Sequence, residues 1–411
     1  MKRLVKSAVL CALVSLMAGC SGGDGKQWYR GNTHTHSLWS DGDATPEEVG
    51  DWYHANGYHF LVMTEHDRIA LSDRWVTIGD RGRISNQQLE DLRARFGREW
   101  VVTRMRDDRL EMKLKTIEEV KTFFEEPGDF LYIDGEELGD RAEGKPLHFN
   151  ALNLVEHIPT QGGDTIMENV ERNLAAINEQ AERLGRLIIS TINHTNWYWA
   201  LTPDQLADMR GTHLFELYNG STGCNNFGDE SHPGMDEVWD IALTRRLSLG
   251  DAGLLYGVAA DDAHNYYSFT ADMSHPGRGW IQVWAAGLSA ESILEAIAAG
   301  DFYSSTGVEL EEVNHTGSRY SVAVAAEDGV TYTIQFIGSR MEDGVVLETG
   351  AILQETTGET ATYRFDGTEL YVRVRIVSSK MQESPLIGEE GPEYAWTQPV
   401  IPEHLRLTPG D

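Results

Sequence analysis

The chain has 411 residues, 41% of them hydrophobic and 24% charged, and its formal net charge is −31 at pH 7. This hydrophobic share is ordinary for a globular protein and excludes an intrinsically disordered chain, and the length suits about two domains. An acidic surface repels phosphate backbones, so a nucleic-acid polymer is excluded as an expected substrate or partner.

The first 27 residues predict an export signal followed by an anchor. Basic residues precede an apolar stretch, residues 8–18, that is too short to span a membrane, so residues 1–19 are expected to be a removed signal peptide. Residues 16–20, Leu-Met-Ala-Gly-Cys, resemble the lipobox of bacterial lipoproteins. This resemblance implies lipid attachment at Cys20, a flexible tether over residues 20–27, and an exported lipoprotein of the cell envelope. Ser21 favours the outer membrane, and an ordinary signal with a chance cysteine is the alternative.

The first two predicted strands lead to histidines. A strand over residues 28–36 carries His34 and His36, which face the same side because side chains alternate along a strand. Asp41 follows in the next turn, where its carboxylate can bend back towards them. A second strand over residues 59–64 leads to His66 and Asp67. The sequence therefore predicts the first half of a metal site.

Residues 71–129 form a segment far longer than an ordinary loop. It contains helix signals over residues 86–95 and 116–125, and it carries five basic residues: Arg104, Arg106, Arg109, Lys113 and Lys115. We expect either an inserted cap that shapes substrate access or a solvated helical excursion.

Further predicted strands bring more metal-binding side chains. Strands are expected over residues 130–133, 148–155, 187–192, 213–218 and 256–260, which makes seven in all. Helices are expected after Thr45, over residues 166–184, 203–209 and 235–246, and after Ser289. Three of the strands lead to acids or histidines and a fourth opens on one: Glu136, Glu137, His148, His194, Asp262 and His264.

Nine possible ligands therefore gather where strands meet loops, the usual place for chemistry in barrel-type α/β folds. A single H-x-H match is more often a coincidence than a site, but six of the 14 histidines fall in this ordered set. One ion needs about four protein ligands, so nine predict two or three divalent ions. Mixed imidazole and carboxylate ligands suit Zn, Mn or Fe.

The pattern and order of these residues resemble the PHP (polymerase and histidinol phosphatase) domain of metal-dependent phosphoesterases, over residues 28–306. The matching motifs are His34-x-His36 with Ser40-Asp41-Gly42, Thr64-Glu65-His66-Asp67, Gly135-Glu136-Glu137 followed by His148 and His194, and Asp262-Ala263-His264. The resemblance implies a distorted (β/α)7 barrel and a trinuclear site bridged by Glu137, with Glu136 as the alternative bridge. The inserted segment over about 71–129 departs from the family pattern.

The resemblance implies hydrolysis of small phosphate mono- or diesters by a water that adjacent ions activate. Asp67, His264 or Asp261 can transfer protons, and Arg68 can grip a phosphate bidentately or pair with Asp67. We expect the pocket to be lined by polar and aromatic residues that follow the fifth and sixth strands: Asn193, Asn196, Trp197, Tyr198, Trp199 and Asn219.

Two other functions stay open. The same water activation can cleave carboxyl esters, carbamates or amides, and a scarcity of cationic pocket residues would favour that activity. A non-catalytic cell-surface binding protein is the second alternative. The sequence does not indicate an oligomeric state.

Residues 307–411 change in character. Apolar and polar residues alternate over residues 320–326, 331–337, 361–365 and 370–377, which predicts a small antiparallel, sandwich-like β domain. No ligand set occurs there. A closing strand is expected near Trp396, with a packing role favoured over carbohydrate binding.

Overall fold

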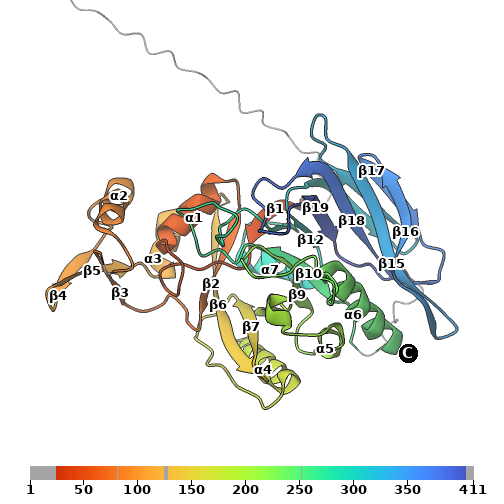
Figure 1. The fold of residues 1–411 in the computed structure, drawn as a ribbon, viewed down its shortest axis with the longest axis horizontal. Coiled ribbons are helices and arrows are strands. Elements are labelled where there is room, and N and C mark those ends of the chain that lie inside the picture. Colours follow the sequence, from red (N-terminus) through yellow and green to blue (C-terminus); the bar gives the residue numbers. More distant parts are fainter. Residues whose placement is uncertain (1–24, 81, 125–127, 251, 404–411) are drawn as a thin grey trace, which may run out of the picture.

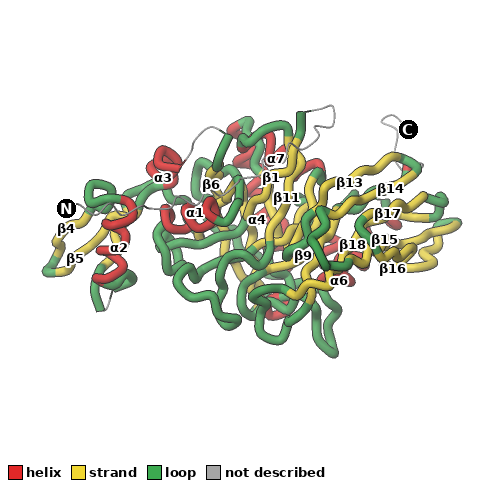
Figure 2. The backbone as a smooth tube through the Cα atoms, turned by 90° about the horizontal axis from the view of Figure 1, so that it is seen from above, coloured by secondary structure: helices red, strands yellow, loops and turns green. Residues whose placement is uncertain are grey.

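The computed structural model describes residues 25–80, 82–124, 128–250 and 252–403, so the predicted signal and Cys20 lie outside the described residues. The chain is a mixed α/β protein with a large central sheet. The insertion lies at one end of the molecule and the C-terminal strands lie at the other (Figure 1). The view from above separates the same three parts (Figure 2). Within the described residues, no helix is both long enough and apolar enough to cross a membrane.

All seven strands expected before residue 306 are present. They are β1 (Gln27–Asn32), β2 (Phe60–His66), β6 (Leu131–Ala142), β7 (Lys145–Leu152), β8 (Ile189–Ile192), β9 (Leu214–Asn219) and β10 (Tyr256–Ala260). Neighbouring strands run parallel except around β7, which is antiparallel to both β6 and β8. Two further strands that the sequence did not suggest, β11 (Trp280–Ala285) and β12 (Phe302–Ser305), extend the sheet beyond β1.

The expected helices form where their caps predict. Thr45 makes a capping box with Glu48 at the start of α1 (Pro46–Ala55), and Ser289 accepts a hydrogen bond from Ser292 at the start of α7 (Ala290–Ala299). The others are α4 (Ile166–Leu184), α5 (Pro203–Asp208) and α6 (Met235–Leu249), and a short 3-10 turn, η1, spans Trp197–Trp199.

The first and last strands of this series, β1 and β10, do not pair with each other, but the segments that follow them come into contact. A single parallel bridge joins Thr35 to Ala263. Within β10, before this bridge, Ala259 donates its backbone N–H to the Ser304 hydroxyl of β12. A closed barrel is therefore not shown, and the predicted (β/α)7 closure stays a prediction, although the contacts bring the segments after β1 and β10 side by side.

The C-terminal strands are antiparallel, as predicted, and they form two sheets. β13 (Leu310–Thr316), β14 (Arg319–Val324) and β17 (Thr360–Arg364) make a separate small sheet. β15 (Tyr332–Glu342), β16 (Val345–Thr357), β18 (Glu369–Met381) and β19 (Pro392–Thr397) instead continue the central sheet, because β19 pairs with β12. The division at residue 306 stays a prediction.

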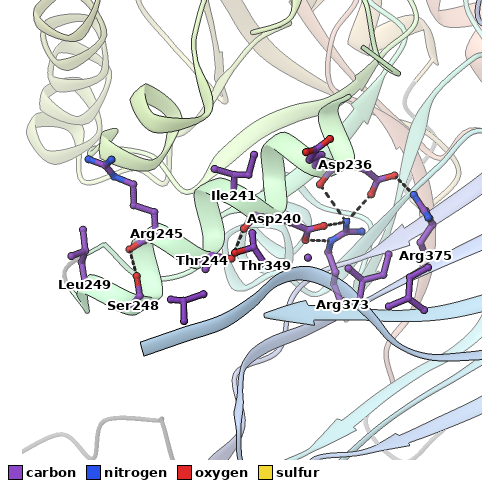
Figure 3. A pocket seen from close by; sticks show the side chains of 15 residues that line it. Asp236, Asp240, Ile241, Thr244, Arg245, Ser248, Leu249, Thr349, Arg373 and Arg375 are labelled. Carbon is purple, nitrogen blue, oxygen red and sulfur yellow. Dashed lines mark hydrogen bonds and ion pairs between the residues drawn. The ribbon is translucent and has the colours of Figure 1, made fainter. Parts of the chain in front are cut away.

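Buried ion pairs fasten these strands to α6. Arg373 is fully buried, and its Nε and Nη2 atoms lie 2.8 and 2.6 Å from the Asp240 carboxylate oxygens (Figure 3). Arg375 donates to Asp236, which also accepts from Trp396 Nε1 at 3.0 Å. Trp396 is only 2% exposed. Its burial and its hydrogen bond to Asp236 support the packing role, and carbohydrate binding by Trp396 stays an untested prediction. A cavity of about 1110 Å³ adjoins these pairs between α6 and β16.

The insertion has a sheet of its own. β3 (Arg74–Thr77), β5 (Arg109–Leu114) and β4 (Thr103–Arg106) pair antiparallel in that order, beside α2 (Asn86–Phe96) and α3 (Ile117–Phe124). Four of its five basic residues are paired with nearby acids: Arg104 with Glu111, Arg106 with Asp107, Lys113 with Asp73, and Lys115 with Glu119.

Candidate metal centre

His34 and His36 lie just beyond β1, in an extended segment held on both sides. The Asp262 N–H donates to the His34 carbonyl and the His36 N–H donates to the Ala263 carbonyl, each at 3.0 Å. On the other side, the Thr64 N–H donates to the Thr35 carbonyl at 3.1 Å. Alternation along this extended segment turns both imidazoles to the same side, as predicted.

Four buried atoms converge at the first group. His34 Nε2 lies 3.2 Å from both Glu137 Oε2 and Asp262 Oδ1, and His36 Nε2 lies 3.3 and 3.1 Å from the same two oxygens. None of these four atoms has a hydrogen-bond partner, although all are buried. Leaving such groups unpaired costs about 1–3 kcal/mol each, so their convergence indicates that a further atom belongs between them.

The spacing of the four atoms fits a metal ion. Tetrahedral ligands at zinc bond lengths of about 2.0–2.1 Å lie about 3.3 Å from one another. The four nitrogen-to-oxygen separations among these atoms are 3.1–3.3 Å. The residues present therefore fit a divalent cation in both chemistry and spacing.

Glu137 extends the site to a second group. Its Oε1 atom lies 3.0 Å from His148 Nδ1 and 3.3 Å from His194 Nε2, and it accepts a hydrogen bond from Asn193 Nδ2 at 2.9 Å. Because its other oxygen belongs to the first group, Glu137 spans both. Glu136 points elsewhere, towards His157 Nδ1 at 2.5 Å and the Ile158 N–H at 3.1 Å. The geometry therefore favours Glu137 over Glu136 as the bridge.

A third group contains Asp41, His66 and His264. Asp41 Oδ1 lies 3.3 Å from His264 Nε2, and Asp41 Oδ2 lies 3.6 Å from His66 Nε2. His66 Nδ1 also lies 2.9 Å from Glu137 Oε2, without the angles of a hydrogen bond. Eight of the nine predicted side chains thus fall in three overlapping groups that could hold divalent metal ions: His34, His36, Glu137 and Asp262; His36, Asp41, His66 and His264; and His66, Glu137 and His148. His194, the ninth, joins them through Glu137 Oε1.

A buried acid that we did not single out from the sequence supports the site from behind. Glu216 on β9 is 2% exposed, and its Oε1 lies 2.6 Å from His34 Nδ1. Its Oε2 accepts from the His194 N–H and from Asn219 Nδ2, each at 2.8 Å. With Nδ1–H donating to Glu216, the Nε2 lone pair of His34 faces the first group. The sequence offered one sign of this role: Glu216 is the single acid within the predicted apolar strand over residues 213–218.

The electrostatics favour a cation. Burial opposes ionisation of Glu137 and Asp262, but the surrounding histidines, His34 foremost, hold both carboxyl pKa values well below their usual range. Burial likewise opposes protonation of His34, yet Asp262, Glu137 and Glu216 raise its pKa well above normal. A divalent cation would stabilise the same carboxylates while leaving the imidazoles neutral.

The cleft beside the three groups has a volume of about 210 Å³. Six of the nine predicted ligands line it, with Trp197 on one side and the hydroxyls of Ser221, Thr222 and Ser274. The Ser274 hydroxyl lies 2.8 Å from the Ser221 hydroxyl and accepts the Thr222 N–H at 3.1 Å. Among the described residues, no Lys or Arg lines this cleft, and neither does any residue of the insertion.

Of the six residues expected to line the pocket, only Trp197 does so. Tyr198 is 65% exposed, and Trp199 stacks on His232 with ring centroids 4.0 Å apart. Asn193 and Asn219 lie behind the cleft, where they donate to Glu137 and Glu216. These polar residues support the site and do not form its wall.

The predicted proton-transfer and phosphate-binding residues lie at different distances from the cleft. His264 lines it. Asp67 is exposed and accepts the Gly139 N–H at 2.8 Å. Arg68 donates its Nε–H to the His66 carbonyl at 3.1 Å and does not line the cleft. Asp261 is buried and accepts from Asn32, Tyr53 and the Arg278 and Gly279 N–H groups, so it faces away from the metal groups.

The chain is similar to solved structures named as phosphoesterases. One is a two-domain protein from Bacteroides vulgatus containing a predicted PHP-like metal-dependent phosphoesterase, 17% identical with a TM-score of 0.42, and the match covers 90% of this chain and 95% of that chain. Another, from Bifidobacterium adolescentis, is 13% identical with a TM-score of 0.29, and the match covers 57% of this chain and 87% of that chain. Its name, metal-dependent phosphoesterase, is also a prediction. No family model and no curated protein matches the chain. A likeness of this degree carries no argument about activity.

Proposed function

We propose that the protein is a metal-dependent hydrolase of small phosphate mono- or diesters. The observation that carries the proposal is the convergence of four buried, unpartnered ligand atoms from His34, His36, Glu137 and Asp262. Two further groups share Glu137 or border it, so the proposal includes two or three divalent ions, of Zn, Mn or Fe.

The side chains have separate roles in this proposal. His34, His36, Glu137 and Asp262 hold the first ion; Glu137, His148 and His194 hold the second; and Asp41, His66 and His264 hold the third. When bound, such ions supply activation of a water and neutralisation of phosphoryl charge.

The cleft walls position the substrate. Trp197 offers an apolar face, and the hydroxyls of Ser221, Thr222 and Ser274 can donate or accept hydrogen bonds to an alcohol leaving group. A volume of about 210 Å³ suits a small substrate. His264 lines the cleft and is proposed to transfer a proton to the leaving oxygen where only two ions are bound. Where His264 holds the third ion, Asp67 is the alternative proton donor. Phosphate binding by Arg68 stays a prediction.

One observation favours a second candidate function. Because no Lys or Arg among the described residues lines the cleft, a neutral carbonyl substrate suits its walls as well as a phosphate does. The same centre would then cleave carboxyl esters, carbamates or amides. A binding protein without catalysis is the remaining alternative.

Turnover of matched chromogenic substrates tests these functions. The mature chain is incubated with a phosphomonoester, a phosphodiester and a carboxyl ester of the same phenol, with and without added Mn or Zn. Metal-dependent cleavage of a phosphoester supports the proposal. Cleavage of the carboxyl ester alone would replace it with the second candidate, and no cleavage of any of them would favour the binding protein.

We also propose that the protein is an exported lipoprotein anchored at Cys20, from the sequence pattern alone. Labelling of cells with a radioactive fatty acid should mark the wild type and a Cys224→Ala control, and it should not mark Cys20→Ala. Labelling of the Cys20→Ala variant would contradict the anchor.

A further inference from the structure

The loop that carries Asp41 is held from outside by one arginine of the insertion. Arg83 Nη1 donates to the Leu38 carbonyl at 3.1 Å and to the Ser40 carbonyl, and Arg83 Nη2 donates to the Gly42 carbonyl at 2.8 Å. Two of these three carbonyls belong to the residues immediately before and after Asp41. A single guanidinium therefore fixes the backbone on both sides of a predicted ligand.

The same loop shares its hydrophobic core with the insertion. Leu38 and Trp39 are 1% and 3% exposed, and they belong to one cluster with insertion residues such as Ile78 and Ile84. Trp39 Nε1 also donates to the Lys115 carbonyl at 2.7 Å. The insertion thus packs against the loop and leaves the cleft open.

The inner side of the loop is fixed by Glu65 of β2. The Ser37 N–H donates to both carboxylate oxygens of Glu65 at 3.1 Å, and the Ser40 hydroxyl donates to Glu65 at 2.5 Å. At Gly42 a Cβ would lie 2.6 Å from the His36 carbonyl oxygen, so the fold of the loop is tight there. Glu65 inside and Arg83 outside together define where Asp41 points.

Asp41 needs this support more than the other ligands do. Its side chain is 57% exposed, whereas those of His34, His36 and Glu137 are fully buried and held by the central sheet. The fully buried ligands of the first group make no contact of this kind with the insertion, whereas Asp41 of the third group lies on a loop that Arg83 holds.

We propose that Arg83 is a positioning residue through which the insertion sets how tightly the third group, Asp41 with His66 and His264, holds a divalent ion. A planar guanidinium presents its donors in a fixed fork, so it can hold several carbonyls at set angles. Loss of such an outer partner typically weakens metal binding by about 10- to 100-fold. The inference rests on the proposed metal site and is independent of the reaction performed there.

Metal binding by an Arg83→Ala variant tests the inference. The full mature chain is titrated with Mn or Zn against a chromogenic chelator, and the ions per chain are counted by native mass spectrometry. We expect the most weakly bound ion to lose about 10- to 100-fold in affinity while the tightest is unchanged. Added guanidinium ion, below denaturing concentration, should restore part of the loss.

Arg93→Ala is the matched control, because it removes the same charge from the insertion. Arg93 donates to Glu90 and Thr103, both within the insertion, and should leave every affinity unchanged. Unchanged affinities in Arg83→Ala, or an equal loss in Arg93→Ala, would overturn the inference.

A second variant covers the case in which Arg83→Ala does not fold. Arg83→Lys keeps the charge but cannot span three carbonyls, so we expect a smaller loss at the weakest position, and unchanged binding would again overturn the inference. A wild-type chain that binds its ions yet cleaves no phosphoester would refute the proposed function and leave this inference standing.

Discussion

Replacing Glu216 by Gln should weaken metal binding without changing the shape of the core. Three donors converge on this carboxylate: His34 Nδ1–H, the His194 N–H and Asn219 Nδ2. A carboxylate accepts all three, whereas a Gln amide has only one accepting oxygen and places N–H groups against the remaining donors. His34 then loses its fixed orientation, or His194 loses its backbone anchor.

The expected loss of metal affinity follows from the role of Glu216 as a hydrogen-bond partner of a metal ligand. A 10- to 100-fold loss of metal affinity corresponds to about 1.4–2.7 kcal/mol. The assay is competition with a chromogenic chelator at constant pH, with Glu237→Gln on the exposed side of α6 as the control. Unchanged affinity in Glu216→Gln, with normal folding, would refute the reasoning that orientation of His34 matters.

Three further outcomes are expected. His36→Ala and Asp262→Ala should each abolish turnover while circular dichroism stays native, and retained activity in either would contradict the site. Asp240→Ala should cost up to about 3–5 kcal/mol of unfolding free energy because it removes the bidentate partner of the buried Arg373 and leaves Asp236 as its other carboxylate, as denaturant titration would show. Burial raises the pKa of Glu47 to about 7. The folded state therefore binds this proton more tightly than the unfolded chain does, and the associated stability, up to about 3 kcal/mol, is present below pH about 4.5 and lost as pH rises through about 7. Glu47→Gln should remove that loss in thermal melts compared between pH 5 and 8, and an unchanged pH profile would contradict the buried acid.

The ligand positions could be predicted because they depend on local pattern. Alternation places His34 and His36 on one side, and an apolar run ending at Ala260 puts Asp262 and His264 just beyond a strand. These features need no knowledge of which strands are neighbours. The order of the strands in the sheet, by contrast, depends on pairing across long stretches of the chain.

The choice between Glu136 and Glu137 required the fold. The expected strand ended at residue 133, but β6 continues to Ala142 and pairs Glu137 with Asn150 of β7. Both acids are therefore inside a strand and face opposite sides, and both are buried. A strand with one buried face normally alternates apolar and polar residues, and this alternation shows which side chains point inward. Both faces of β6 carry a buried acid here, so the alternation could not tell Glu136 from Glu137.

The role of the insertion also lay beyond the sequence. The sequence left open an inserted cap that shapes substrate access and a solvated helical excursion, and most of the five basic residues pair with acids nearby and none lines the cleft. The contact that matters joins Arg83 to backbone carbonyls of residues 38–42. Every residue has a backbone carbonyl, so the residue types at positions 38–42 could not have predicted this contact with Arg83.

Counting bound metal ions per chain tests the central claim most directly. The mature protein, equilibrated with excess Mn or Zn and freed of loosely bound ions, is weighed by native mass spectrometry beside a His36→Ala variant. Two or three ions on the wild type, and fewer on the variant, are predicted. One ion or none on the wild type, or an equal number on both, would contradict a multinuclear centre built on His34, His36, Glu137 and Asp262.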